Sequence, residues 1–135
     1  MIEQVTDIFD NNVIGVLATV HEDGSPRATP IHVATDGQSV YWFSKEDTVH
    51  SGNIARDSRV GLSLFSPDLS GGPKGVYLHG HAEVLDETGY TEARNSFERR
   101  FGSFPPHFEG WSAYRLLIGT LDEQKSTGGC WYFYT

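Results

Sequence analysis

The feature that most constrains the fold of this chain is a series of short, β-branched segments separated by tight turns. Residues 13–20 are almost continuously apolar, as is typical of a well-buried strand. Turn sequences follow at 21–24 and 36–37, and each ends in Asp-Gly, a strong signal for a hairpin. With further strands expected over 27–35 and 40–43, this part of the chain predicts an antiparallel meander.

The remaining periodicity predicts four more strands and up to three helices. Apolar residues alternate with polar ones in the strands and recur every three or four positions in the helices. We expect strands over 60–65, 76–84, 114–121 and 130–134, and helices over 2–11, 47–57 and from a cap at Asp86 or Thr88 to Phe101. Residues 102–111 contain two prolines and are expected to be irregular.

These elements predict a mostly β fold, a six- to seven-stranded antiparallel barrel with two to three short helices. Closure of a barrel removes the exposed strand edges that an open sheet would leave. The 135 residues contain no internal repeat or linker, and 38% are apolar and 21% charged, as in ordinary globular proteins. We therefore expect one domain over residues 1–135.

Charge and cysteine content narrow the classes of partner. Acidic residues outnumber basic ones 18 to 10, so binding to nucleic acid or to an anionic membrane is not expected, whereas a small anionic ligand is compatible. No apolar run is long enough to span a bilayer, and residues 1–12 lack the Lys or Arg of a secretory signal. A single cysteine, Cys130, excludes an intramolecular disulfide and favours a cytoplasmic protein.

Several polar or reactive groups could carry chemistry. His79 and His81 share one face of a predicted strand, where they could offer two ligands to a metal, although solvent-facing or interface histidines are the favoured interpretation. The glycine-rich residues 70–75 lack the spacing of a phosphate loop and are interpreted as an ordinary loop. Cys130 lies among aromatic residues and is expected to be buried and inert.

The segment 44–54 combines a strand end with a helix start. Ser44 ends the strand, and Thr48, His50 and Asn53 lie in the first turns of the predicted helix. Unpaired N–H groups and a partial positive charge make a helix N-terminus suitable for phosphate, and hydroxyl groups or an imidazole would add hydrogen bonds. The alternative is plain helix capping by Asp47 or Thr48.

The order of several segments adds a resemblance. Residues 24–32, 40–44, 48–60 and 80–84 resemble successive elements of the pyridoxamine 5′-phosphate oxidase-like family of flavin-binding split barrels. The resemblance extends over about residues 5–101 and, more loosely, over the C-terminal part. It implies a split barrel that forms a homodimer, with two FMN sites at the interface between the subunits.

The resemblance also implies roles for individual residues. The backbone around residues 29–32 would run along the flavin ring, while Ser44, Thr48 and His50 match positions that hold the FMN phosphate. Trp131 could close over the flavin of the partner subunit or belong to the core, and we favour the core. The complete set of cofactor-binding residues expected is Arg27, Thr29, Pro30, Ile31, His32, Phe43, Ser44, Thr48, His50, Asn53 and Trp131.

The chain departs from the enzymes of this family at positions that usually carry charge or an amide. The family usually has Lys at His50, Arg at Val49, a basic residue at Ala34 and Gln at Gly75. Arg27 and Lys74 are candidates to compensate for the missing positive charge.

The function expected from the resemblance is an FMN-dependent oxidoreductase that acts on a nicotinamide or another small organic substrate. No general acid or base is assigned. The alternatives are a non-enzymatic flavin-binding module for stress or redox sensing, a barrel that binds the deazaflavin F420, a barrel that binds haem, and one that has lost its cofactor. A haem protein would need an axial ligand, for which His79, His81 and His107 are candidates.

Overall fold

The computed structural model describes residues 1–127 and 130–135, and its strands form the expected mostly β split barrel with three α-helices. The elements, in chain order, are α1 (Glu3–Asp10), β1 (Ile14–Val20), β2 (Pro26–His32), β3 (Ala34–Thr35), β4 (Ser39–Ser44), α2 (Val49–Arg56), β5 (Arg59–Phe65), β6 (Gly75–Val84), α3 (Glu87–Phe101), a 3₁₀ turn (Pro106–Phe108), β7 (Ser112–Leu117) and β8 (Trp131–Tyr134).

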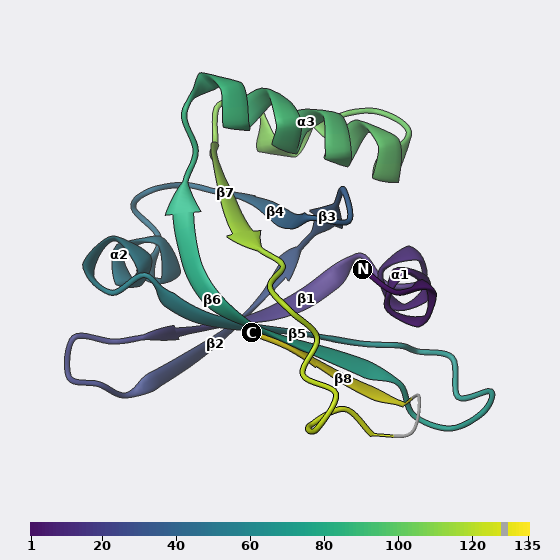
Figure 1. Ribbon diagram of the computed structural model, residues 1–135. Coiled ribbons are helices and arrows are strands. Elements are labelled where there is room, and N and C mark those ends of the chain that lie inside the picture. Colours follow the sequence, from purple (N-terminus) through teal and green to yellow (C-terminus); the bar gives the residue numbers. More distant parts are fainter. Residues whose placement is uncertain (128–129) are drawn as a thin grey trace.

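One curled sheet contains all the strands, in the order β2-β1-β5-β6-β7-β4-β3, with β8 added beside β6 (Figure 1). The long strand β6 joins the two halves, because residues 75–81 pair with β5 and residues 82–84 pair with β7. The two ends of the sheet, β2 and β3, are consecutive in the chain. No ladder among the described strands joins these two ends, so the barrel is split and lacks the full closure that the strand count suggested.

The strand predicted over 27–35 is interrupted at Val33. The Val33 N–H donates to the carbonyl of Val13 at 2.8 Å, beside β1, whereas Ala34 already pairs with Tyr41 of β4. The chain therefore leaves one half of the sheet and enters the other within two residues. The residue types over 27–35 do not reveal such a change of partner, because β-branched residues such as Ile31, Val33 and Thr35 favour a strand beside either neighbour.

The C-terminal strands also differ from expectation. The strand predicted over 114–121 ends at Leu117. The last strand, β8, runs parallel to β6, with Val76 opposite Tyr132, so the sheet is not antiparallel throughout. A parallel pair needs a connection of about a dozen residues or more, and here the chain passes through α3 and β7 between β6 and β8.

The helices begin where the capping chemistry predicts. Thr48 caps α2, its Oγ1 accepting from the N–H of Ser51 at 3.3 Å. Asp86, and not Thr88, caps α3 by accepting from the N–H of Gly89 at 2.9 Å. After α3, the segment 102–111 is irregular as expected apart from the single 3₁₀ turn.

None of the helices in the described ranges is long and apolar enough to cross a membrane.

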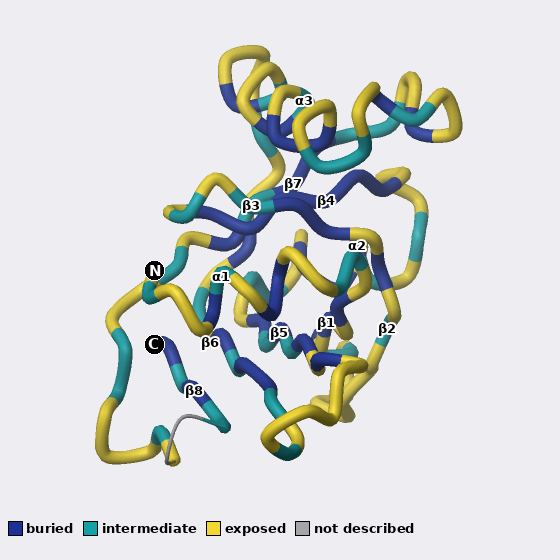
Figure 2. Tube along the Cα trace, turned by 90° about the vertical axis from the view of Figure 1, so that its right-hand side faces the viewer, coloured by how far each residue is buried: buried dark blue, intermediate teal, exposed yellow. Residues whose placement is uncertain are grey.

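Two hydrophobic clusters stabilise the fold. One fills the inside of the curl and includes Leu17, Trp42 and Leu62. The other lies between β4, β7 and α3 and includes Phe43 and Phe97. Because both of its faces are covered, β4 is buried at all six positions, and Figure 2 shows it as a continuous dark blue segment beneath α3.

Candidate functional site

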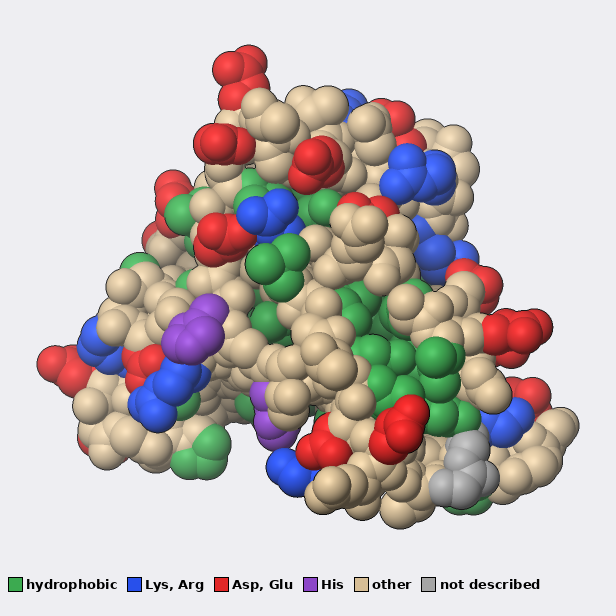
Figure 3. Space-filling view, in the orientation of Figure 1, with side chains coloured by type: hydrophobic (Ala, Val, Ile, Leu, Met, Phe, Trp, Pro, Cys, Tyr) green, Lys and Arg blue, Asp and Glu red, His purple; other side chains and the backbone are tan. Residues whose placement is uncertain are grey.

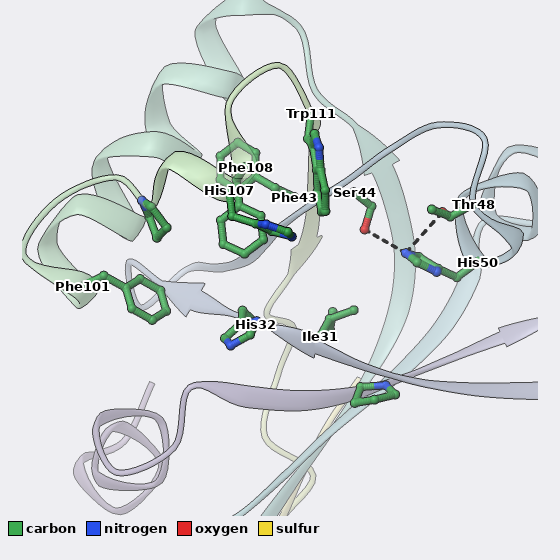
Figure 4. A pocket seen from close by; sticks show the side chains of 12 residues that line it. Ile31, His32, Phe43, Ser44, Thr48, His50, Phe101, His107, Phe108 and Trp111 are labelled. Carbon is green, nitrogen blue, oxygen red and sulfur yellow. Dashed lines mark hydrogen bonds between the residues drawn. The ribbon is translucent and has the colours of Figure 1, made fainter.

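A cavity of about 550 Å³ opens beside β2, the end of β4 and the start of α2 (Figure 4). Its remaining wall comes from the end of α3 and the segment that follows it. The residues that line it are Pro30, Ile31, His32, Phe43, Ser44, Thr48, His50, Phe101, Pro105, His107, Phe108 and Trp111.

One end of the cavity, hereafter the hydroxyl end, is formed by Ser44, Thr48 and His50. The Nε2 atom of His50 lies 2.8 Å from Ser44 Oγ and 3.4 Å from Thr48 Oγ1 (Figure 4). Thr48 is the N-cap of α2, so the free N–H groups of the first helical turn lie beside these side chains. The two interpretations of this segment are therefore compatible, since the residue that caps the helix also lines the cavity.

The charge at the hydroxyl end comes from His50 and from neighbouring side chains. Burial lowers the pKa of His50 below its ordinary value of 6.5, and the positive charge of nearby Arg27 lowers it further. Lys45 follows Ser44 directly, and its Nζ lies 5.7 Å from the ring centroid of Trp111. Lys74, the other residue considered for compensation, lines a different cavity with Gln4, Asp7 and other residues.

The opposite end, hereafter the aromatic end, is formed by Phe101, His107, Phe108 and Trp111. The ring centroids of His107 and Trp111 are 4.9 Å apart, and those of Phe108 and Trp111 are 5.4 Å apart. The sequence indicated His107 only as a candidate axial haem ligand and Phe101 only as the end of a helix. Phe108 and Trp111 were not predicted, because the segment after α3 was expected only to be irregular. Its unusual density of aromatic residues and histidine was the signal that could have indicated it.

The aromatic end is held in place by the packing of its own segment. Phe104 and Phe108 are buried against α3 and Phe43. Arg94 of α3 lies 4.1 Å from the ring centroid of Phe104 and donates to both carboxylate oxygens of Glu109, at 2.9 and 3.2 Å. The turn between α3 and β7 is thus a braced wall of the cavity.

The chemistry of the lining suits a planar anion. Among the described residues that line the cavity there is no carboxylate, although the chain as a whole carries a net charge of −8. Acidic side chains instead lie scattered over the outer surface, where Lys and Arg form only small separate groups on the face shown in Figure 3. Hydroxyl, imidazole and helix N–H donors at one end fit a phosphate, and the apolar walls fit a ring system, so the residues present are compatible with FMN.

The structure brings together most of the residues predicted from the sequence. Those that line the cavity are Pro30, Ile31, His32, Phe43, Ser44, Thr48 and His50. Asn53 does not reach it, because its side chain is buried and donates to Thr19 Oγ1 at 3.0 Å. Thr29 lies opposite Leu17 in the ladder and so points into the barrel, where its Oγ1 has no hydrogen-bond partner among the described residues.

Trp131 lies neither in the cavity of its own subunit nor in the core that we favoured for it. It is half-buried on the outer face of the sheet, with its ring centroid 6.0 Å from those of Phe65 and Tyr77. Cys130, which was expected to be buried, is also only half-buried. Both residues lie at the start of β8, where the Gly75 N–H at the start of β6 donates to the carbonyl of Cys130 at 2.8 Å.

The remaining histidines are separated from the cavity. His79 and His81 are exposed on the outer face of β6, and His81 Nδ1 lies 2.7 Å from Ser58 Oγ. The described residues contain no group of three potential metal ligands. Of the three histidines considered as axial haem ligands, His107 lines the cavity. His32, which was not considered for that role, lines it as well.

Fold and cavity together define a split-barrel protein with a pocket that suits a planar anionic ligand. The sequence profile of the pyridoxamine 5′-phosphate oxidase family matches residues 1–118. The chain belongs to this family. A search of curated proteins finds no match for it.

Solved structures with the same fold include a conserved hypothetical protein, a haem storage protein and a protein described as F420 reductase. The conserved hypothetical protein Rv2991 from Mycobacterium tuberculosis is 25% identical, with a TM-score of 0.70 over 86% of this chain and 79% of that one. HutZ, the haem storage protein from Vibrio cholerae, is 14% identical, with a TM-score of 0.70 over 84% and 87%. A protein described as F420 reductase is 19% identical, with a TM-score of 0.63 over 82% and 89%. The last two likenesses show the fold alone.

Proposed function

We propose that the cavity binds FMN and that the protein is an FMN-dependent oxidoreductase acting on a nicotinamide or another small organic substrate. The observation that carries the proposal is the position of Ser44, Thr48 and His50 at a helix N-terminus, at one end of an apolar cavity. Among the described lining residues no carboxylate would repel a phosphate.

The phosphate is assigned to the hydroxyl end. The first N–H groups of α2 and the hydroxyls of Ser44 and Thr48 would donate to its oxygens. Arg27 and His50 would supply positive charge in place of the Lys and Arg that the family usually has here. Arg27 fits this role because its charge already acts on His50.

The ring is assigned to the side of β2. This strand ends the sheet, so on its outer edge the backbone N–H and C=O groups that point away from β1 are available for a ligand. The backbone N–H and C=O groups near Ile31 and His32 would bind the polar edge of the flavin ring. Phe43 and the aromatic end would exclude water from it. FMN supplies the redox chemistry when bound, and the protein's part is to orient the ring and shield it.

We also propose that the protein acts as a homodimer through the outer face of β1, β5, β6 and β8. Val16 and Phe65 on this face are 41% and 52% exposed. The rings of Tyr77, Phe133 and Trp131 extend the apolar surface, with Tyr77 stacked on Phe133 at 4.7 Å. An exposed apolar surface of this kind is typical of an interaction site, and a second copy is the partner that the family resemblance implies.

Haem is the second candidate ligand. The observation that favours it is the position of His107 and His32 in an apolar cavity, where an imidazole could bind iron. F420 has less support, because its long anionic tail needs a basic groove and the described lining of the cavity contains no Lys or Arg. The cytoplasm is the proposed location, since the free Cys130 fits a reducing compartment.

The proposal is tested by the absorption spectrum of the purified protein, recorded before and after FMN is added and the excess removed. We expect retained flavin bands that NADH or NADPH bleaches. Flavin that is retained but not reduced by either nucleotide would make the protein a passive flavin binder. A protein that retains no FMN overturns the proposal, and a haem absorption band would then select the second candidate.

A further inference from the structure

We propose that a buried hydrogen bond between Thr19 and Asn53 positions α2 for phosphate binding, so that this pair sets how strongly the cavity prefers a phosphorylated ligand. Neither side chain lines the cavity, so both would act through the helix, as positioning residues. The inference rests on the proposed FMN site. It adds the device that determines the selectivity of that site for FMN over riboflavin, which has the same ring and no phosphate.

The first argument is the contact itself. Thr19 is 1% exposed and Asn53 is 4% exposed, and Asn53 Nδ2 donates to Thr19 Oγ1 at 3.0 Å. Asn53 Oδ1 accepts from Arg56 Nη2 at 3.0 Å, and the same nitrogen donates to the carbonyl of Val20. An apolar contact would tolerate a range of helix positions, whereas a satisfied buried hydrogen-bond network specifies one. These side chains therefore fix α2 in one position on β1.

The second argument is what the pair joins. Asn53 lies about one turn after the start of α2, which contacts β1 beside the hairpin of β1 and β2 (Figure 1). Arg27 stands opposite Thr19 in the ladder of this hairpin, and opposite side chains leave a sheet on the same face. Burial and then the charge of Arg27 lower the pKa of His50, so Arg27 lies near the hydroxyl end. The pair thus connects the donors of α2 to the strand pair that carries the cation.

The third argument is the small amount of fixed charge at the site. The described lining of the cavity contains no Lys or Arg, so phosphate binding would depend mainly on hydrogen bonds from hydroxyl and helix N–H groups. Hydrogen bonds weaken steeply when their length or angle changes, whereas the attraction between charges falls off slowly with distance. A small displacement of α2 would therefore reduce phosphate affinity. Contacts of the ring with β2 would be unaffected.

The test compares the dissociation constants of FMN and riboflavin by fluorescence titration, because the two compounds differ only in the phosphate. Thr19→Val removes the hydroxyl and keeps a β-branched side chain. We expect it to lower the preference for FMN over riboflavin by about 5-fold, as for the loss of one hydrogen bond to the phosphate, with little change in riboflavin affinity. Thr19→Ser keeps the hydroxyl and should retain the preference of the parent protein.

Further variants separate positioning from a general loss of stability. Ser96→Ala removes a buried hydroxyl of α3 that accepts from Arg99 at 3.1 Å, and it should leave the preference unchanged. Asn53→Leu should lower the preference at least as much as Thr19→Val. The double variant should lower it no further than Asn53→Leu alone, because both changes break the same hydrogen bond. Additive effects of the two changes would overturn the assignment, and so would equal losses of FMN and riboflavin affinity in Thr19→Val.

The remaining outcomes separate this inference from the proposed function. If the parent protein binds FMN and riboflavin equally well, the phosphate is not recognised and the inference is overturned while a flavin site stands. If it binds neither, pyrophosphate is titrated and the backbone amide signals of α2 are followed by ¹⁵N-edited NMR. Saturable shifts that Thr19→Val weakens and Thr19→Ser retains would support the inference without the flavin. The absence of such shifts, or equal shifts in the two variants, would overturn it together with the proposed function.

Discussion

The two halves of the curled sheet differ in what covers their outer faces. The half that contains β4 and β7 is covered by α3 and the segment after it, and β4 is buried on both sides. The half that contains β1 and β5 has no described element over its outer face, so β1 alternates between buried and exposed residues. Both halves nevertheless present apolar side chains outward.

Strands with apolar side chains on their outer face therefore have different roles in the two halves. In the covered half, the outward apolar side chains hold α3, and the segment that follows the helix becomes the aromatic wall of the cavity. In the uncovered half, similar side chains remain available to another surface. Variants of Phe97, Phe65, Val16 and Leu117 compare the two halves, and variants of Thr48 and His50 test the cavity.

The largest effect is expected on stability in the covered half. Phe97 is 0% exposed and packs against Phe43 at a ring-centroid distance of 4.9 Å. Phe97→Ala should lower the free energy of unfolding by about 3–5 kcal/mol, because it leaves a cavity in the core. Phe65→Ala on the uncovered face, measured by the same urea denaturation at a concentration where the protein is monomeric, should cost below about 1 kcal/mol. Similar losses would contradict the difference between the two halves.

The next effect concerns the homodimer. Val16→Glu should weaken association by about 2 kcal/mol or more, roughly 30-fold, because it buries an unpaired charge in the proposed interface. Leu117→Glu is the matched control, since Leu117 is 58% exposed on β7. Sedimentation equilibrium gives both dissociation constants. If Val16→Glu leaves the dimer intact, the partner surface lies elsewhere; if it weakens FMN binding as well, the cavity depends on the second subunit.

A smaller effect is expected at the hydroxyl end. Thr48→Ala should weaken FMN binding by about 1 kcal/mol, roughly 5-fold, through the loss of a hydroxyl donor. Thr48→Ser keeps both the hydroxyl and the helix cap and should bind FMN like the parent protein. Fluorescence titration of FMN measures the three dissociation constants. An unchanged value for Thr48→Ala would place the phosphate away from the start of α2.

The smallest effect is the pH dependence that His50 imposes. Burial and Arg27 lower the pKa of His50 in the free protein, and a bound phosphate would raise it again. Protonation of His50 should therefore strengthen FMN binding as the pH falls below 6.5, and the gain should disappear as the pH rises through the pKa of the complex. His50 is only half-buried, so solvent weakens its interaction with the phosphate. We therefore expect the dissociation constant of FMN to change by no more than about 5-fold.

The phosphate of FMN itself titrates near pH 6, so the comparison is made against His50→Gln. The ratio of the two dissociation constants should grow as the pH is lowered from 7 to 5.5. A constant ratio would remove His50 from the phosphate site.

Local chemistry made much of this molecule predictable. The Asp-Gly turns, the cap at Thr48 and the alternation in β6 each depend on neighbours in the chain, and each element formed close to its expected position. The hydroxyl end was predictable for the same reason, since Ser44, Thr48 and His50 lie within seven residues of one another. Asn53 was misassigned because helical spacing does not tell whether a polar side chain turns to the cavity or to a partner such as Thr19.

The sequence by itself determined the class of fold and the residues of the hydroxyl end, because short-range periodicity, capping and turn chemistry specify them. Only the tertiary structure decided the break at Val33, the parallel pairing of β8 and the use of the segment after α3 as a cavity wall. These features depend on contacts between residues far apart in the chain, such as Phe43 with Phe108 and Val76 with Tyr132. Apolar residues favour burial without selecting the surface that buries them, so the partner is settled only when the whole chain packs.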